Sequence, residues 1–180
     1  MNEVVTNREC EEDCGSAGAR CQPGLVLVRR EGEGQGEGTA AGRQFRAIGE
    51  RYHGLPPDER LQWRSFLLKL TADNLKNARD DEQFVASHKA VFVVYAALGD
   101  ICIFTVGKDE YDELALVEVL TAVTSSIRDV CKRAPSERVF LEKYGKVCLC
   151  LDEIVVQGRL EQTDKDRVRR LTRLKPLAEG

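Results

Sequence analysis

Two consecutive apolar segments near the middle of the chain constrain its fold more than any other feature. Residues 89–95 read Lys-Ala-Val-Phe-Val-Val-Tyr, residues 101–106 read Ile-Cys-Ile-Phe-Thr-Val, and the turn Leu98-Gly99-Asp100 lies between them. Short runs of β-branched and aromatic residues joined by a tight turn predict an antiparallel hairpin. Successive side chains of a strand point to opposite faces of a sheet, and both strands are apolar at successive positions. The sheet that contains them must therefore be covered on both faces.

Three other segments are predicted to be strands because they are short and rich in β-formers. They are residues 24–29, residues 43–51 and Val147-Cys-Leu-Cys-Leu151. Residues 31–42 between the first two are rich in Gly and Glu and are predicted to form a flexible hairpin loop. This loop is not interpreted as a phosphate cradle, because no Gly-Lys-Ser/Thr motif follows it and its glutamates would repel phosphate.

Apolar residues three or four apart predict the helices. Long helices are expected at 56–76 and 109–130, shorter ones at 136–143, from 152–153 and at 168–176, and a polar connection at 77–87. The predicted order is β-β-α-β-β-α-α-β-α. Adjacent strands joined by short turns are antiparallel, so this order predicts the α+β class with a five-stranded antiparallel sheet and helices on both faces. One domain is expected at 23–175, with a disordered acidic tail at 1–22 and a short tail at 176–180.

Composition excludes several classes of function. The chain has 180 residues and a net charge of −3, which is too close to neutral for a dedicated nucleic-acid binder. No apolar run reaches the roughly 20 residues that span a bilayer. The start Met1-Asn-Glu-Val-Val lacks the features of a signal peptide, so a cytoplasmic location is expected.

The seven cysteines are interpreted as ordinary thiols. An odd count without a secretory signal argues against a disulfide framework. Cys148 and Cys150 would share one face of the predicted strand 147–151 and pack as small hydrophobes. A zinc site from Cys10, Cys14 and Cys21 is disfavoured because their spacing is not that of a zinc finger.

A cluster of carboxylates opens the second long helix. These acids could form an acid–base pair or a cation site, but capping of a helix N-terminus explains them, with Asp109 as the predicted N-cap. His53 and His88 do not suggest a dyad, and no serine or cysteine has a nucleophile context. No catalytic, cofactor-binding or metal-binding residue is therefore predicted, and no small-molecule substrate. The cluster consists of Asp109, Glu110, Asp112 and Glu113.

Basic residues gather near the C-terminus against a single acid, Asp166. A basic segment of this kind can contact anionic lipid or an acidic partner, and the alternative is a solvated helix face. The residues are Lys165, Arg167, Arg169, Arg170, Arg173 and Lys175.

The run from Lys89 to Asp164 resembles coatomer zeta and the sigma chains of clathrin adaptors. The pieces that carry the resemblance follow one another in order and spacing. They are the apolar hairpin 91–106, Tyr111-Asp-Glu-Leu-Ala-Leu-Val-Glu-Val-Leu120, Arg138-Val-Phe-Leu-Glu-Lys-Tyr-Gly-Lys-Val147, Leu151-Asp-Glu-Ile-Val155 and Gly158-x-Leu-Glu-x-Thr163.

This resemblance implies a longin-like (SNARE-like) fold and a non-catalytic small subunit of a heteromeric vesicle coat. Its implied partners are a large helical-solenoid subunit that clasps it and the other coat subunits. Sigma chains use the middle and end of their long helix to bind dileucine sorting signals, but Thr124-Ser125-Ser126 and Lys132-Arg133-Ala134 stand there in this chain. The better match is to zeta-type chains or to the longin-like small subunit of the TSET (plant TPLATE) coat. The first implies Golgi-related transport and the second implies endocytosis.

Three aromatic residues, Trp63, Tyr111 and Tyr144, are candidate partner contacts because interfaces are enriched in aromatics. Core packing is the alternative for each of them. Because fold does not fix function, a free-standing longin-like regulator or tethering component that binds a small GTPase is the alternative to a coat subunit. The sequence Asp152-Glu-Ile154 followed by Gly158-x-Leu-Glu161 favours the coat subunit.

Overall fold

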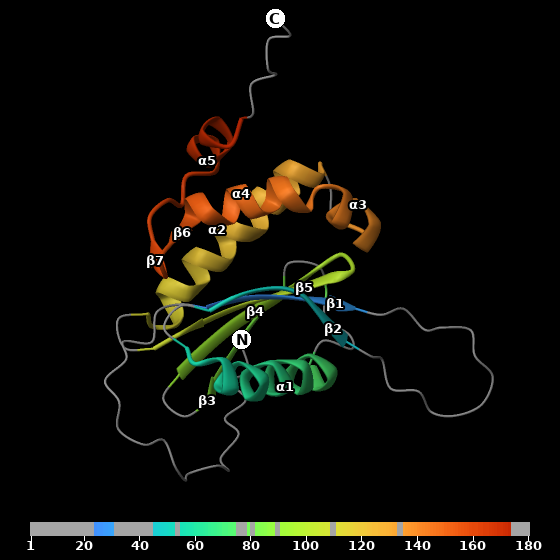
Figure 1. Ribbon diagram of the computed structural model, residues 1–180, viewed down its shortest axis with the longest axis vertical. Coiled ribbons are helices and arrows are strands. Elements are labelled where there is room, and N and C mark those ends of the chain that lie inside the picture. Colours follow the sequence, from blue (N-terminus) through green and yellow to red (C-terminus); the bar gives the residue numbers. More distant parts are fainter. Residues whose placement is uncertain are drawn as a thin grey trace, which may run out of the picture.

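The computed structural model in Figure 1 describes most of the chain that follows residue 23. The predicted tails at 1–22 and 176–180 and the predicted loop at 31–42 lie outside the described residues, and the extent of a domain at 23–175 stays a prediction. The described residues are 24–30, 45–52, 55–74, 79, 82–88, 91–108, 111–132 and 135–173.

The centre of the structure is an antiparallel sheet with the strand order β2-β1-β5-β4-β3. The predicted apolar hairpin supplies two of its three inner strands, which confirms that interpretation. Leu98 pairs with Ile101 across the turn, where Gly99 adopts φ 60°. The strands are β1 (Gly24–Arg30), β2 (Phe45–Arg51), β3 (Gln83–His88), β4 (Val91–Leu98) and β5 (Ile101–Gly107).

Helices cover both faces of the sheet, as the apolar hairpin requires. Figure 1 shows α1 (Pro57–Asn74) on one face and both α2 (Glu113–Cys131) and α4 (Tyr144–Ile154) on the other. Alternate residues of the hairpin divide the core accordingly, since Tyr95 and Phe104 pack under α1 while Ile103 packs with α2 and α4. The remaining elements are α3 (Glu137–Glu142), the ribbon β6 (Val155–Val156) with β7 (Arg159–Leu160), and α5 (Lys165–Leu171).

The α+β class and the antiparallel pairing are confirmed, but the predicted set of strands is wrong at three places, one of which is the β6–β7 ribbon, which was not predicted. The predicted polar connection 77–87 contains all of β3 except His88, and this strand forms because Phe84, Val85 and Ala86 pair with β4 and become half-buried. The predicted strand 147–151 lies inside α4. The observed order is β-β-α-β-β-β-α-α-α-β-β-α.

Helix α4 forms because its apolar residues fit a helical face as well as a strand. Its buried residues are spaced three and four apart, and they pack on α2. Cys148 and Cys150 therefore do not share a face, since Cys150 is buried and Cys148 is only half-buried. The predicted cap Asp152 lies in the last turn of α4 and pairs with Arg51 of β2 at 2.7 Å. The buried residues of α4 are Val147, Cys150, Leu151 and Ile154.

Replacing Gly145 with alanine should stabilise the protein. Gly145 lies in the first turn of α4, and a Cβ added there meets no atom within 4 Å. Alanine restricts the unfolded chain and favours the helix, so the free energy of unfolding should rise by about 0.5–1 kcal/mol. Guanidinium unfolding measures this change. A loss of stability would contradict the placement of Gly145 inside α4 with open space at its Cβ.

The N-cap of helix α2 lies three residues later than predicted. This N-cap is Asp112, whose Oδ1 accepts the backbone N–H of Ala115 at 2.9 Å, so the capping role of the carboxylate cluster is confirmed at this position. The predicted N-cap Asp109 lies outside the described residues, as does Glu110.

Tyr52 occupies the corner where β2 leads into α1. The Arg60 guanidinium lies 5.8 Å from the ring centroid, and Arg64 forms a two-point ion pair with Glu50 beside it. Burial, and next the charge of Glu50, raise the pKa of Tyr52 to about 12. Among the described residues, no group hydrogen-bonds the buried Tyr52 hydroxyl.

The raised pKa predicts a loss of stability at high pH. The folded protein holds the Tyr52 proton more tightly than the unfolded chain, so this contribution is complete below the unfolded pKa of about 10 and is lost as the pH rises towards 12. The Tyr52→Phe variant has no titrating hydroxyl at this position. Above about pH 10, its free energy of unfolding should therefore rise relative to that of the wild type. Guanidinium unfolding of both proteins from neutral pH to about pH 11 tests it. Parallel stability profiles would contradict the placement of Tyr52.

Candidate partner-binding surface

The three candidate aromatic residues lie apart on the molecule. Trp63 is half-buried on α1, where its ring stands edge-on to Phe66 and to His88 of β3, with both centroid distances 5.8 Å. Tyr111 and Tyr144 lie on the other layer, before α2 and at the start of α4. These residues therefore do not form one patch.

Both tyrosines make intramolecular contacts from half-buried positions. The Tyr111 hydroxyl oxygen accepts the backbone N–H of Leu160 at 3.2 Å and so ties the β6–β7 ribbon to the start of α2. Tyr144 stands edge-on to Phe140 at 5.8 Å, and burial and a hydrogen bond with Cys148 raise its pKa. These contacts give each tyrosine a structural role whether or not it also meets a partner.

Residues 165–171 of the C-terminal basic segment form the short helix α5, which packs against α2 and α4. Asp164 caps α5, and its carboxylate accepts the backbone N–H groups of Asp166 at 2.9 Å and Arg167 at 3.4 Å. Val168 and Thr172 are buried on the inner side of the helix. This anchoring fixes the direction in which each basic side chain of α5 projects.

The described basic residues of this segment fall into two sets. Lys165 and Arg169, one helical turn apart, line a groove between α5 and α2. Arg167, Arg170 and Arg173 are exposed and do not line it. Lys175 lies outside the described residues. The segment is therefore not one uniform basic surface.

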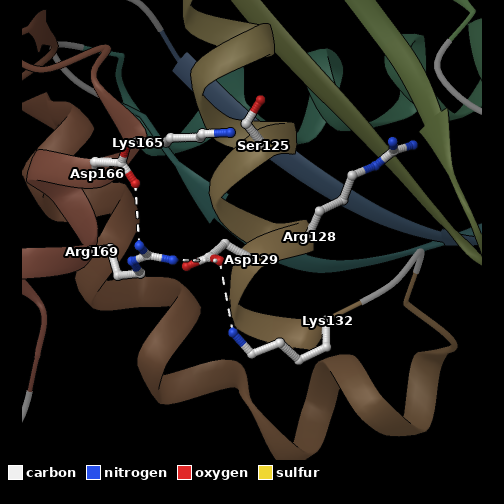
Figure 2. A pocket seen from close by; sticks show the side chains of 7 residues that line it. All are labelled: Ser125, Arg128, Asp129, Lys132, Lys165, Asp166 and Arg169. Atoms are coloured by element: carbon white, nitrogen blue, oxygen red, sulfur yellow. Dashed lines mark hydrogen bonds and ion pairs between the residues drawn. The ribbon is translucent and has the colours of Figure 1, made fainter.

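The groove has a volume of about 490 Å³ and polar walls (Figure 2). The last two turns of α2 form one wall, and the first turn of α5 forms the other. Figure 2 shows the Lys165 side chain extending towards Ser125, while the Arg128 head group points away from the groove. The lining residues are Ser125, Arg128, Asp129, Lys132, Lys165, Asp166 and Arg169.

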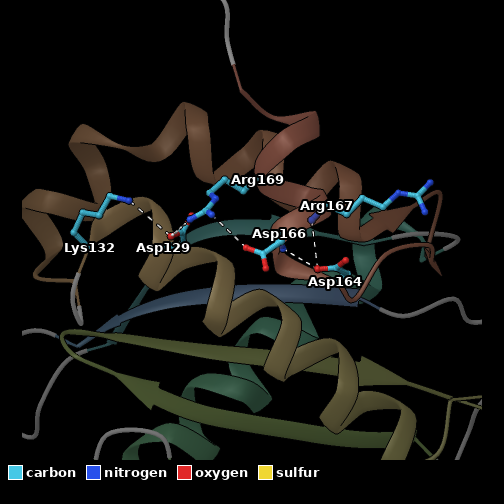
Figure 3. A network of polar contacts seen from close by, with 6 residues as sticks. All are labelled: Asp129, Lys132, Asp164, Asp166, Arg167 and Arg169. Carbon is cyan, nitrogen blue, oxygen red and sulfur yellow. Dashed lines mark hydrogen bonds and ion pairs between the residues drawn. The ribbon is translucent and has the colours of Figure 1, made fainter.

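A chain of ion pairs crosses the floor of the groove (Figure 3). Arg169 contacts Asp129 Oδ1 through Nη1 and Asp166 Oδ1 through Nη2, both at 3.3 Å. The Lys132 amine lies 3.7 Å from the same Asp129 oxygen. Among the described residues, no carboxylate pairs with Lys165. Of these three pairs, only Arg169–Asp129 joins α5 to α2, because each of the other two lies within one helix. A solvated pair of this kind contributes about 0–1 kcal/mol.

Beneath the groove, the three helices meet at a buried junction. The Cys150 thiol lies 3.7 Å from the Thr172 hydroxyl, which donates to the backbone carbonyl of Val168 at 2.8 Å. Burial raises the pKa of Cys150, which makes the thiol less reactive. None of the four cysteines in the described part of the chain forms a disulfide, and the three buried ones pack as small hydrophobes, as expected.

Sequence reasoning missed the α2 wall of the groove. Ser125, Asp129 and Lys132 recur at steps of four and three, so they share a helix face. That spacing was available as a signal, but only the docking of α5 turns the face into a groove.

Other kinds of site are not found in the described part of the chain. No three of its His, Cys, Asp or Glu side chains are grouped so that they could hold a metal ion, and the predicted alternative at Cys10, Cys14 and Cys21 lies outside it. No helix of that part is long and apolar enough to cross a membrane. What the described surface offers is a charged groove and half-buried aromatics.

Comparison with known proteins gives the family. Residues 52–178 match the family model for the clathrin adaptor complex small chain. The TSET complex member tstD of Dictyostelium discoideum is 29% identical over 125 residues, which are 69% of this chain and 81% of tstD.

Two rice (Oryza sativa subsp. japonica) proteins match over shorter stretches. Coatomer subunit zeta-3 is 31% identical over 56% of this chain and 57% of its own length. Coatomer subunit zeta-1 is 35% identical over 40% of this chain and 41% of its own length.

Because the family model covers more than half of the chain, the expected resemblance is confirmed. The chain belongs to the clathrin adaptor complex small chain family, and it is a non-catalytic small subunit of a vesicle coat or adaptor complex.

Proposed function

We propose that the protein is the small subunit of a TSET-type coat, the type represented in plants by TPLATE. The observation that carries this proposal is the extent of similarity. The match to tstD spans 81% of that protein, whereas the match to rice coatomer zeta-3 spans 57%.

The proposed mechanism is scaffolding of a large subunit. A longin-like sheet covered by helices on both faces offers a rigid body that a large helical-solenoid subunit can clasp, with the other coat subunits as further partners. We infer a cytoplasmic protein held peripherally at membranes through this complex. Arg167 and Arg170 of α5 and Arg173 just after it are exposed and do not line the groove, and they are the proposed contacts with anionic lipid.

Trp63 is the strongest of the three proposed partner contacts. It is half-buried, and its aromatic neighbours Phe66 and His88 give it a preformed orientation. Trp63→Ala should lower retention of the large subunit about tenfold or more in a pull-down, as expected for an interfacial tryptophan. The matched control is Leu61→Ala on the same helix, where the side chain is 62% exposed. If Trp63→Ala retained the large subunit as fully as the wild type and Leu61→Ala, Trp63 would not lie at the interface.

Tyr111→Phe and Tyr144→Phe keep the rings and remove only the hydroxyls. If the rings contact the large subunit, both variants should retain it, whereas alanine at either position should release it. Thermal unfolding of each variant alone separates a lost interface from a lost fold. Full retention by folded alanine variants would leave both tyrosines with only their intramolecular roles.

The location of a fluorescently tagged copy in its native cells tests the type of coat. A TSET-type subunit should gather in spots at the plasma membrane, because endocytosis is the proposed process. Spots that coincide with coatomer at the Golgi would overturn the proposal in favour of a zeta chain.

A further inference from the structure

We propose that the groove between α2 and α5 binds an extended acidic peptide segment of a partner protein. The segment would carry two carboxylates about three residues apart, one for Lys165 and one for Lys132. The proposal goes beyond membership of a coat, and it holds whichever coat the chain serves.

The two lysines mark the two ends of the groove. Lys165 extends towards Ser125, and Lys132 lies beyond Asp129 at the other end (Figure 2). Ser125 and Lys132 are seven residues apart on α2, which is about 10 Å along the helix axis at 1.5 Å per residue. In a polyproline-II segment, residues i and i+3 share a face and lie about 9 Å apart. Two acids at that spacing therefore match both ends at once.

The charges left for a ligand lie at these ends. The Arg169 guanidinium lies between the carboxylates of Asp129 and Asp166, so these three side chains leave one net negative charge at the centre of the groove (Figure 3). Lys132 shares Asp129 with Arg169 and sits at the longer distance of 3.7 Å. Lys165 has no carboxylate partner among the described residues. The Ser125 hydroxyl beside the Lys165 end adds a donor for an incoming carboxylate.

A peptide fits this arrangement better than a membrane does. The groove is recessed between two helices, and Asp129 and Asp166 on its floor would repel a dense layer of phosphates. A peptide places its acids only at the ends and can cross the acidic centre with uncharged backbone or small side chains. The exposed cations that a flat surface can reach are Arg167, Arg170 and Arg173, which do not line the groove.

The test uses the full chain and a fluorescein-labelled Gly/Ser peptide with two aspartates three residues apart. The same peptide with asparagines is the ligand control. Lys132→Gln/Lys165→Gln removes the end charges, and Arg167→Gln/Arg170→Gln removes two charges from exposed positions outside the groove. Fluorescence anisotropy measures the affinity of each protein for each peptide. Vesicles of phosphatidylserine and phosphatidylcholine are offered to the same three proteins.

The aspartate peptide should bind the wild type more tightly than the asparagine peptide. The groove variant should lose about tenfold in affinity, which is what two exposed ion pairs can supply, and the outer variant should stay within about twofold. Vesicle binding should instead depend on the outer arginines. Equal losses from both variants, or equal binding of both peptides, would overturn the proposal. If the groove variant alone lost vesicle binding, the groove would be a membrane contact, and the proposal would be overturned as well. Because the test uses the isolated chain, none of these outcomes depends on the coat.

Discussion

Replacing Phe104 with alanine should lower the free energy of unfolding by about 3–5 kcal/mol, the typical cost of deleting a buried phenylalanine ring. Phe104 is 0% exposed at the centre of β5. Its ring stacks on Tyr95 at 5.2 Å between centroids, and Tyr95 stacks on Phe84 at 5.3 Å. The row of three rings crosses from β5 to the edge strand β3 under α1, so loss of the inner ring leaves a cavity that one covering helix cannot close.

Guanidinium unfolding followed by far-ultraviolet circular dichroism measures this loss. Leu61→Ala is the matched control, because Leu61 lies on α1 with 62% of its surface exposed and should change stability by less than about 0.5 kcal/mol. A loss below about 1 kcal/mol for Phe104→Ala would contradict the ring stack and the place of α1 over it.

Replacing Gly107 with alanine should destabilise the protein by about 1–3 kcal/mol, as overpacking of a tight core does. Gly107 ends β5 where the chain turns back towards α2. A Cβ there would lie 2.6 Å from Tyr111 Cβ and 2.9 Å from Leu116 Cδ2. The Leu116 methyl can rotate away only into a core where its side chain is fully buried, and the Tyr111 Cβ moves only with its backbone.

The control is the same substitution at Gly145, where the Cβ meets open space. The two glycine-to-alanine changes should therefore shift the guanidinium midpoint in opposite directions. Tyr111 also accepts the Leu160 N–H, so Gly107→Ala should loosen the β6–β7 ribbon, which hydrogen exchange at Leu160 reports. A stabilising effect at Gly107 would show that β5 and the start of α2 are not in contact.

The sequence predicted the centre of the fold better than its edges. The hairpin β4–β5 is apolar on both faces, so pattern and tertiary context favour the same structure. β3 has only six residues and two exposed polar positions, Gln83 and Ser87, and its pairing with β4 decides its conformation. Val147–Leu151 favours a strand by composition, but burial against α2 at helical spacing makes it a helix.

The groove between α2 and α5 shows that tertiary contacts also limit how well functional residues can be predicted from the sequence. Composition alone located a basic segment at 165–175, because clustered charge is visible without a structure. The division of that segment into groove-lining and outward residues depends on Val168 and Thr172, which anchor α5. The α2 wall with Asp129 is added by tertiary docking, which no local pattern encodes. Trp63, Tyr111 and Tyr144 are candidates by residue type alone. Residue type does not encode a position in the fold, and the structure places these side chains on different parts of the molecule.

The most direct test of the account is affinity purification of a tagged copy from its native cells, with mass spectrometry of the proteins that accompany it. A small subunit of a TSET-type coat should bring along large helical-solenoid subunits and a medium chain of that coat, and Trp63→Ala should reduce them. Recovery of coatomer subunits, or of a small GTPase or tethering factors without any coat subunit, would contradict the account.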